Sequence, residues 1–207
     1  MTLNINEHQP KNFGWLEVDL DDEAINHIWS CAKGKKQPYK DKLVGHIESS
    51  YLLQDKNDYL WKNVIKPCVN YYGKRYGHVH ANIPILSPLT PYLQDLWINY
   101  QNQHEFNPIH DHGGVYSFAA WLKIPYDFQE QGENYNSKEV SYKFNGTFCF
   151  EYANILGQQT TYAYQLDKSY EGKLIFFPAK LKHVVYPYYN CDEQRVSIAG
   201  NVNLKCK

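Results

Sequence analysis

Three neighbouring residues, His110, Asp111 and His112, carry side chains that can bind a metal ion. A further histidine, His183, lies far downstream in a segment that is typical of a strand, and Arg195 opens the next such segment. Neutral imidazoles bind iron, zinc, copper and nickel, and three ligands that leave open positions suit mononuclear Fe(II) and its chemistry with O2. The pattern indicates a mononuclear iron site beside an arginine that binds an anionic co-substrate.

The period of an extended backbone decides which of these side chains can share one metal. Residues 110 and 112 project to the same side of a strand, whereas Asp111 projects to the other. We therefore expect His110, His112 and His183 to be the ligands, with Asp111 accepting a hydrogen bond that orients one ring. The alternative is a carboxylate site in which Asp111 binds the metal together with His183 and one neighbouring histidine.

A second His-x-His pair, His78 and His80, lies in the connection between a helical and a strand-rich region. No arginine follows it at a comparable position, so we interpret this pair as structural. Pairs of this kind are common, and the histidines at 110 and 112 could likewise cap a turn and form only local hydrogen bonds. The downstream His183 and Arg195 are what distinguish the first pair from the second.

The segment Arg195–Leu204 predicts how the arginine is oriented, because alternate residues of a strand face opposite sides. We expect one side to be apolar and to lie under helices, and the other to line a cavity. A buried arginine without a partner is unfavourable, and its rigid fork suits a carboxylate. The apolar side comprises Val196, Ile198, Gly200, Val202 and Leu204; the polar side comprises Arg195, Ser197, Ala199, Asn201 and Asn203.

Three further candidates concern the same anion. Ser197 could donate a hydrogen bond to the group that Arg195 binds. Asn99 and Tyr100 precede the histidine segment and could donate to the co-substrate or the substrate, or could equally be core and edge residues. The alternative for Arg195 is an ordinary salt bridge, for which the candidate acids are Asp192, Glu193 and Glu151.

The elements around these residues predict an α+β fold. One helical pattern begins at Asp21. A second spans Asp58–Tyr76, and Pro67 is expected to kink it. Helices followed by many short strands favour a double-stranded β-helix, the jelly-roll or cupin-like core, with the N-terminal helices packed on one sheet. We expect a single domain, 1–207, in which 1–80 is a mainly helical support and 90–205 is the core. Strands are predicted at Leu93–Gln101, Tyr116–Ile124, Thr147–Ala153, Thr160–Leu166, Lys173–Phe177, Lys182–Tyr186 and Arg195–Leu204, and 127–146 is a candidate lid.

The composition excludes few classes of function but indicates the cellular compartment. A formal net charge of −1 gives no general electrostatic argument for nucleic acid or for an anionic membrane. No apolar run approaches the length of a membrane span, and the N-terminal residues do not resemble a signal peptide. The five cysteines are odd in number and form no Cys-x-x-Cys pair, which favours a reducing, cytoplasmic setting over a disulfide framework.

Two segments resemble the 2-oxoglutarate- and Fe(II)-dependent oxygenases. The first runs from Tyr100 through Asn107–His112 and the following strand; the second is Gly172–Pro178, leading to His183 and then to Arg195 and Ser197. The sequence looks most similar to small oxygenases of bacteria and marine phages that share the His-x-His motif, for which the setting would be the host cytoplasm. The resemblance is clearest from 95 to 203.

The resemblance implies Fe(II) ligands at His110 and His183 and a grip by Arg195 and Ser197 on the 2-oxoglutarate carboxylate. His112 stands where the family usually has a carboxylate. The implied reaction couples decarboxylation of 2-oxoglutarate by O2 to hydroxylation of a C–H bond in an unidentified substrate. Two other hypotheses stay open: a cupin-like three-histidine metalloenzyme that does not use 2-oxoglutarate, and a non-catalytic jelly-roll binding module.

Overall fold

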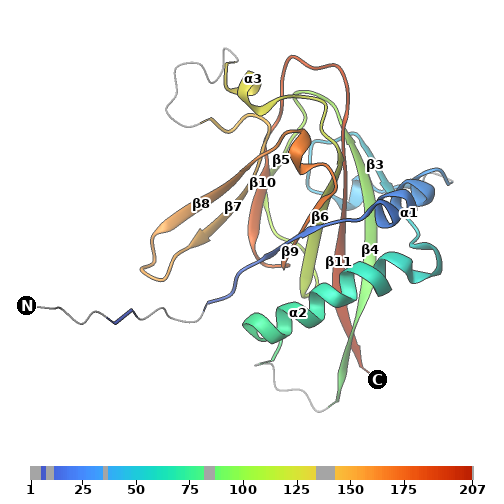
Figure 1. Cartoon of the computed structure of the whole chain (residues 1–207), viewed down its shortest axis with the longest axis vertical. Coiled ribbons are helices and arrows are strands. Elements are labelled where there is room, and N and C mark those ends of the chain that lie inside the picture. Colours follow the sequence, from blue (N-terminus) through green and yellow to red (C-terminus); the bar gives the residue numbers. More distant parts are fainter. Residues whose placement is uncertain (1–5, 8–11, 35–36, 82–86, 134–142, 207) are drawn as a thin grey trace, which may run out of the picture.

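Two antiparallel β-sheets form the core, and two helices cover the outer face of the larger sheet (Figure 1). The computed structural model describes residues 6–7, 12–34, 37–81, 87–133 and 143–206. The larger sheet has the strand order β1-β9-β6-β11-β4-β3-β2 and the smaller one β5-β10-β7-β8. This is the predicted α+β jelly-roll arrangement.

The strand bounds show how long central strands run beside short outer ones. In the larger sheet they are β1 Leu16–Asp19, β2 Gln37–Pro38, β3 Ser49–Leu52, β4 Leu89–Gln101, β6 Tyr116–Lys123, β9 Lys173–Pro178 and β11 Arg195–Cys206. In the smaller sheet they are β5 Asn107–His110, β7 Thr147–Ala153, β8 Gln159–Gln165 and β10 Lys182–Val185.

The helices form where the sequence supplies their ends. Helix α1 (Asp22–Ala32) begins after Asp21, whose carboxylate accepts a hydrogen bond from the backbone N–H of Ala24. Helix α2 (Lys66–Tyr76) follows a π-helical turn at Trp61–Ile65. The backbone is helical without a break over 59–76, so the longer helix expected from the sequence forms, and its irregularity is the π-helical turn directly before Pro67.

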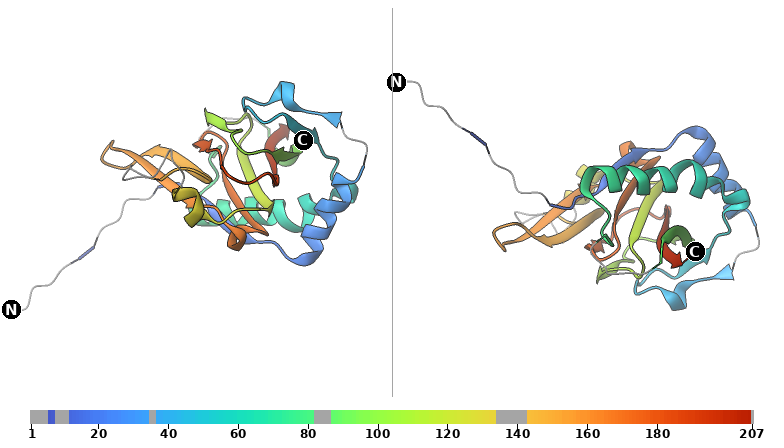
Figure 2. Two further views of the ribbon diagram at one scale, coloured as in Figure 1. Left: turned by 90° about the horizontal axis from the view of Figure 1, so that it is seen from above. Right: turned by 90° about the horizontal axis from the view of Figure 1, so that it is seen from below.

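Strand β11 confirms the predicted division into two faces. Its apolar residues, Val196, Ile198 and Val202, are buried in a cluster with Ile28 of α1 and Tyr72 of α2. The views along the sheet show both helices on this one side, with the second sheet on the other (Figure 2). The polar face of β11 therefore points between the sheets, where the cavity lies.

Four strands were not predicted, and three of them belong to the N-terminal part. β1, β2 and β3 extend the larger sheet, so residues 1–80 supply strands as well as helical support. β1 pairs with β9, and β3 pairs with β4, both distant in sequence. Such short segments have too little periodicity of their own, and their conformation depends on a partner elsewhere in the chain.

The segment predicted as a lid is only partly described. It contains a short helix, α3 (Phe128–Gly132), whose first turn is capped by the Asp127 carboxylate, while residues 134–142 lie outside the described part. Across the described residues, no helix is long and apolar enough to cross a membrane.

Candidate functional site

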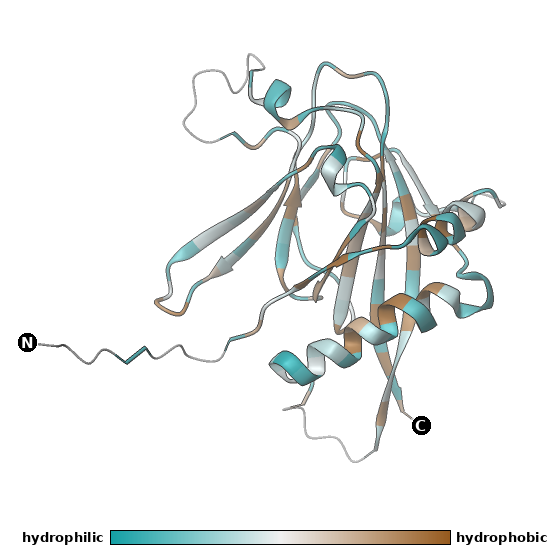
Figure 3. Cartoon of the chain, viewed as in Figure 1, coloured by the Kyte–Doolittle hydropathy of each residue, from teal (hydrophilic) through white to brown (hydrophobic). Residues whose placement is uncertain are grey.

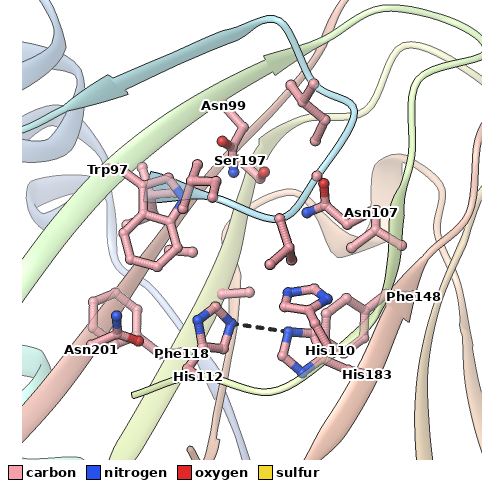
Figure 4. A pocket seen from close by; sticks show the side chains of 18 of the residues that line it. Trp97, Asn99, Asn107, His110, His112, Phe118, Phe148, His183, Ser197 and Asn201 are labelled. Atoms are coloured by element: carbon pink, nitrogen blue, oxygen red, sulfur yellow. Dashed lines mark hydrogen bonds between the residues drawn. The ribbon is translucent and has the colours of Figure 1, made fainter. Parts of the chain in front are cut away.

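Three histidines from two strand regions meet at one end of the space between the sheets (Figure 4). His110 of β5 and His183 of β10 are directly paired across the two strands. His112 follows just after β5, where its backbone N–H donates to the carbonyl oxygen of Ala179. One ligand atom from each of the three rings lies within 4.8 Å of the other two. The fold thus joins a local pair with the remote histidine.

Backbone carbonyls orient two of the three rings. The Nδ1 atom of His110 lies 2.7 Å from the carbonyl oxygen of Pro108, and Nδ1 of His183 lies 3.0 Å from that of Leu181. A carbonyl can only accept, so each Nδ1 carries the proton and each Nε2 is left with a free lone pair. This is the tautomer that a metal ligand needs, and the backbone supplies the orienting acceptors.

The spacing of the rings also fits a metal. Nε2 of His112 lies 3.1 Å from Nε2 of His183. Two imidazole ligands about 2.1 Å from one metal and at right angles to each other would have nitrogens roughly 3.0 Å apart. The donor set is three neutral nitrogens on one side, which leaves further positions open to other ligands.

Burial keeps these rings neutral. It lowers the pKa of His112 to about 4 and the pKa of His110 below its usual range, and it lowers the pKa of His183 far more. The neighbouring imidazoles add to the effect for His112 and His183, since two protonated rings so close would repel each other. Near neutral pH, protons therefore do not compete with a metal for the Nε2 atoms.

Asp111 does not join the three histidines. Its carboxylate turns away, as strand alternation requires, and accepts a hydrogen bond from Nζ of Lys180 at 3.1 Å. That hydrogen bond lowers the pKa of Asp111. The expectation that Asp111 orients a ring is corrected for His110 and His183, because backbone carbonyls already occupy both Nδ1 positions.

Arg195 lies at the other end of the cavity and is almost wholly buried, with 1% of its surface exposed. Its Nε and Nη2 donate to the side-chain oxygen of Gln101 at 3.1 and 2.6 Å, and Nη1 donates to the hydroxyl of Tyr126 at 2.6 Å. Arg195 and Gln101 are direct cross-strand neighbours on β11 and β4. The rings of Tyr126 and Tyr188 also lie against the guanidinium.

Each of these partners of Arg195 is neutral. Within the described part of the chain, no carboxylate lies within ion-pair distance of the guanidinium, so its charge is not balanced there. The three acids considered as salt-bridge partners are engaged elsewhere: Glu193 with Lys123, Asp192 with Gln103, and Glu151 with Thr161.

A cavity of about 180 Å³ connects the histidines to Arg195. Ser197 and Asn99, which are cross-strand neighbours on β11 and β4, line it between the two ends (Figure 4). The side-chain oxygen of Asn99 accepts from the hydroxyl of Ser50 at 2.7 Å, so its amide NH2 remains available to the cavity. Aromatic side chains form much of the remaining wall: Trp97, Phe118, Trp121, Phe148 and Phe177.

Tyr100 lies on the opposite face of β4 from Asn99. Its ring contacts Tyr51 and packs against the cluster beneath the helices. The expectation that Tyr100 donates to a co-substrate is therefore wrong, because neighbouring residues of a regular strand cannot both face one cavity.

A segment before β3 lines the cavity, and Figure 4 shows it crossing above the histidines. Gly45 in this segment lies so close to Asn107 that a Cβ atom there would lie 1.6 Å from the Asn107 side-chain oxygen. A larger residue at this position would require the Asn107 side chain to move. The segment contributes Tyr39, Lys42, Leu43, Val44, Gly45 and Ile47 to the lining.

Several lining residues were not anticipated from the sequence. Gln101 had the clearest signal, because it follows Asn99 by two residues and so shares its face of β4. Asn201 belongs to the polar face of β11 but was given no role. Asn107 opens β5, a strand that was not predicted, and Tyr126, which contacts Arg195 from the segment after β6, had no usable signal in the sequence.

The comparisons with known proteins agree with this geometry. The family profile described as "Putative 2OG-Fe(II) oxygenase" matches residues 95–201, just over half of the chain. The structure is similar to that of an oxidoreductase of the 2OG-Fe(II) oxygenase family from Burkholderia pseudomallei, with a TM-score of 0.54, 13% identity, and coverage of 92% of this chain and 84% of that chain. It is also similar to a prolyl-4-hydroxylase from Pseudomonas putida, with a TM-score of 0.50, 13% identity and 92% of each chain covered.

Comparison with curated proteins gives no sequence match. At 13% identity the two structural likenesses show the fold, a double-stranded β-helix, and nothing about substrate. The profile match is more specific, because it spans both His110 and Arg195 and thus both ends of the cavity. The chain therefore belongs to the 2-oxoglutarate- and Fe(II)-dependent oxygenases, enzymes that use Fe(II), 2-oxoglutarate and O2.

Proposed function

We propose that this protein is a hydroxylase that binds Fe(II) through His110, His112 and His183 and depends on 2-oxoglutarate held by Arg195. The observation that carries the proposal is the guanidinium of Arg195, which is buried, lacks a carboxylate partner among the described residues, and shares one small cavity with three neutral imidazoles. Such a charge is unfavourable without an anion.

The two ends of the cavity match a dicarboxylate. In the proposed complex, Arg195 binds the carboxylate farther from the histidines, and the hydroxyl of Ser197 donates to the same group. The Asn99 amide lies beside Ser197 and supplies a second neutral donor. Gln101 and Tyr126 hold the guanidinium in place before the anion arrives, so little of the binding free energy is lost in ordering it.

The histidines hold the other end. When bound there, Fe(II) would activate O2 as the oxidant while 2-oxoglutarate supplies two electrons and is decarboxylated to succinate and CO2, so that one oxygen atom enters succinate and the other becomes the hydroxyl group on a substrate C–H bond. The backbone carbonyls of Pro108 and Leu181 hold the rings of His110 and His183 in the ligand tautomer. Phe148 and Phe177 line the cavity next to His183 and exclude water from it.

Using His112 in place of a carboxylate changes the charge of the site. Three neutral ligands do not offset the charge of a divalent metal, and Arg195 adds a further positive charge at the far end. A dianionic co-substrate is then attracted at both of its carboxylates. We expect 2-oxoglutarate to bind more tightly to the metal-loaded protein than a monocarboxylic keto acid of the same length does.

The test is an anaerobic titration of the protein with Fe(II) and then with 2-oxoglutarate, followed by visible absorbance for the metal-to-ligand charge-transfer band. The parent protein should develop the band, and Arg195→Ala should require at least ~10-fold more 2-oxoglutarate to reach it. Arg75→Ala is the matched control, because Arg75 is the only other arginine of the chain and is exposed on α2.

Two results would contradict the proposal. Metal uptake without a band in the parent protein would favour a three-histidine metalloenzyme that does not use 2-oxoglutarate. A band whose 2-oxoglutarate dependence is the same in Arg195→Ala and in the parent would show that the arginine does not hold the co-substrate.

A further inference from the structure

Strand β8 forms one edge of the smaller sheet, and within the described residues it pairs only with β7. Every second residue of an edge strand turns its N–H and C=O groups outward, where another strand can pair with them. Proteins usually protect such edges with charges, proline, bulges or very short strands. Whether β8 carries such protection can be judged against the other three edges of this molecule.

The other three edges are protected. β1 has four residues, of which Glu17 and Asp19 are acidic. β2 has two residues and includes Pro38. β5 has four residues and includes Pro108. Charge, proline and shortness are the expected devices, and each of these edges has at least two of them.

β8 has none of them. It is seven residues long, it pairs with β7 in unbroken register, and it contains no charge and no proline. Aromatic and β-branched residues, which favour strand pairing, make up more than half of it. Its sequence is Gln159-Thr160-Thr161-Tyr162-Ala163-Tyr164-Gln165.

We propose that β8 is an interface strand that pairs antiparallel with β8 of a second copy of this chain, about a twofold axis at Tyr162. A second copy fits because the strand is complementary to itself when reversed. Gln159 then lies opposite Gln165, and Thr161 lies opposite Ala163. Tyr162 faces its own counterpart, so two aromatic rings meet and no like charges oppose each other.

The strand is held in place for this pairing. The indole N–H of Trp15 donates to the hydroxyl of Tyr164 at 2.7 Å, and the Trp15 ring lies 5.1 Å from that of Tyr162. These contacts fix the inner face of the hairpin and leave its outer edge free in the described structure. Tyr162 itself remains 45% exposed.

The shape of the molecule leaves room for a second copy. The β7–β8 hairpin projects away from the body, with β8 outermost (Figure 1). Its tip carries two exposed apolar side chains, Ile155 and Leu156, and Figure 3 shows the tip as hydrophobic. A copy paired along β8 would extend the four-stranded sheet into one of eight strands and would lie beside this apolar tip.

The test is the mass of the full chain in solution by sedimentation equilibrium, over concentrations from roughly micromolar to millimolar, since a single strand pair makes a small interface. The parent protein should form dimers. Tyr162→Lys places two positive charges opposite each other at the axis and should weaken dimerisation at least ~10-fold. Tyr71→Lys makes the same change at an exposed site on α2 and should leave the dimer unchanged.

A second measurement tests the register. Tyr162→Cys should form a disulfide-linked dimer on mild oxidation, because directly opposed strand residues lie within disulfide range; Tyr71→Cys should not. A parent protein that is monomeric at all concentrations, or a dimer that Tyr162→Lys leaves intact, would overturn the proposal. Fe(II) binding measured on the same samples would be unaffected in either case, so the proposed function is tested separately.

Discussion

The chain contains two His-x-His pairs, whose rings are equally far apart but inclined differently, at 71° in His110 and His112 and at 32° in His78 and His80. The ring centroids lie 5.1 Å apart both in His110 and His112 and in His78 and His80. The surroundings differ. His183 adds a third imidazole to the first pair, with its ring 4.2 Å from His110 and 4.9 Å from His112.

The second pair instead meets a tyrosine. Nδ1 of His78 lies 3.2 Å from the hydroxyl of Tyr116, and burial raises the pKa of that hydroxyl, so it stays protonated and is no metal ligand. The second pair lies just after α2, whereas the first ends a strand that is directly paired with β10. The motif alone therefore does not make a site; the strand that supplies the third ligand does.

Of the predictions made here, removing the third ligand, His183, should have the largest effect, and the effect is on Fe(II) binding. His183→Ala should abolish stoichiometric Fe(II) binding, because the remaining two histidines would then be no better placed than the second pair. His80→Ala is the matched control and should bind metal as the parent protein does. Anaerobic calorimetric titration with Fe(II) measures both. Stoichiometric binding by His183→Ala would break the comparison, and circular dichroism would check that the variant is folded.

Acid should act on the first pair through His112. The unfolded imidazole has a pKa near 6.5, whereas burial lowers the folded value to about 4. The unfolded state thus binds the proton first, so stability is fully present above pH ~6.5 and is lost as the pH falls towards about 4, by about 3 kcal/mol for this residue. Denaturant unfolding of the metal-free protein at several pH values measures the loss. His112→Gln should make the dependence shallower; an unchanged slope would contradict the assignment.

The first pair also shares its cavity with Arg195. The neutral side chain of Gln101 leaves the charge of that guanidinium unbalanced. Gln101→Glu keeps the shape of the side chain but places a carboxylate on the guanidinium, which would neutralise it. We expect 2-oxoglutarate to bind about 10-fold more weakly while Fe(II) affinity is unchanged. Glu171→Gln, whose side chain does not line the cavity, is a control for the amide–acid exchange. Unaltered 2-oxoglutarate affinity would show that the charge of Arg195 is not what attracts the co-substrate.

The smallest effect is expected at Asp111, between the two histidines of the first pair. Its carboxylate is paired with Lys180 at the surface, and surface pairs contribute little. Asp111→Asn should change Fe(II) affinity less than ~3-fold. A much larger loss would mean that the carboxylate turns to the metal when the metal binds, which is the carboxylate site that the sequence left open.

The sequence predicts which side chains of a long strand point to the same face, and this places many of the residues of the site. Alternation in β11 put Arg195 and Ser197 on the cavity side, and alternation around 111 separated Asp111 from its neighbouring histidines. The same rule, applied to β4, would have found Gln101 and excluded Tyr100. Seven strands were predicted near their observed positions because each has its own periodic pattern.

The sequence alone predicts which residues of a strand share a face, because that depends only on the two-residue period of the extended backbone. The tertiary structure decided which strands lie together: that His183 is paired with His110, that Gln101 is opposite Arg195, and that three short N-terminal strands complete the larger sheet. Those pairings join segments far apart in the chain, and their free energy comes from contacts that no local pattern contains.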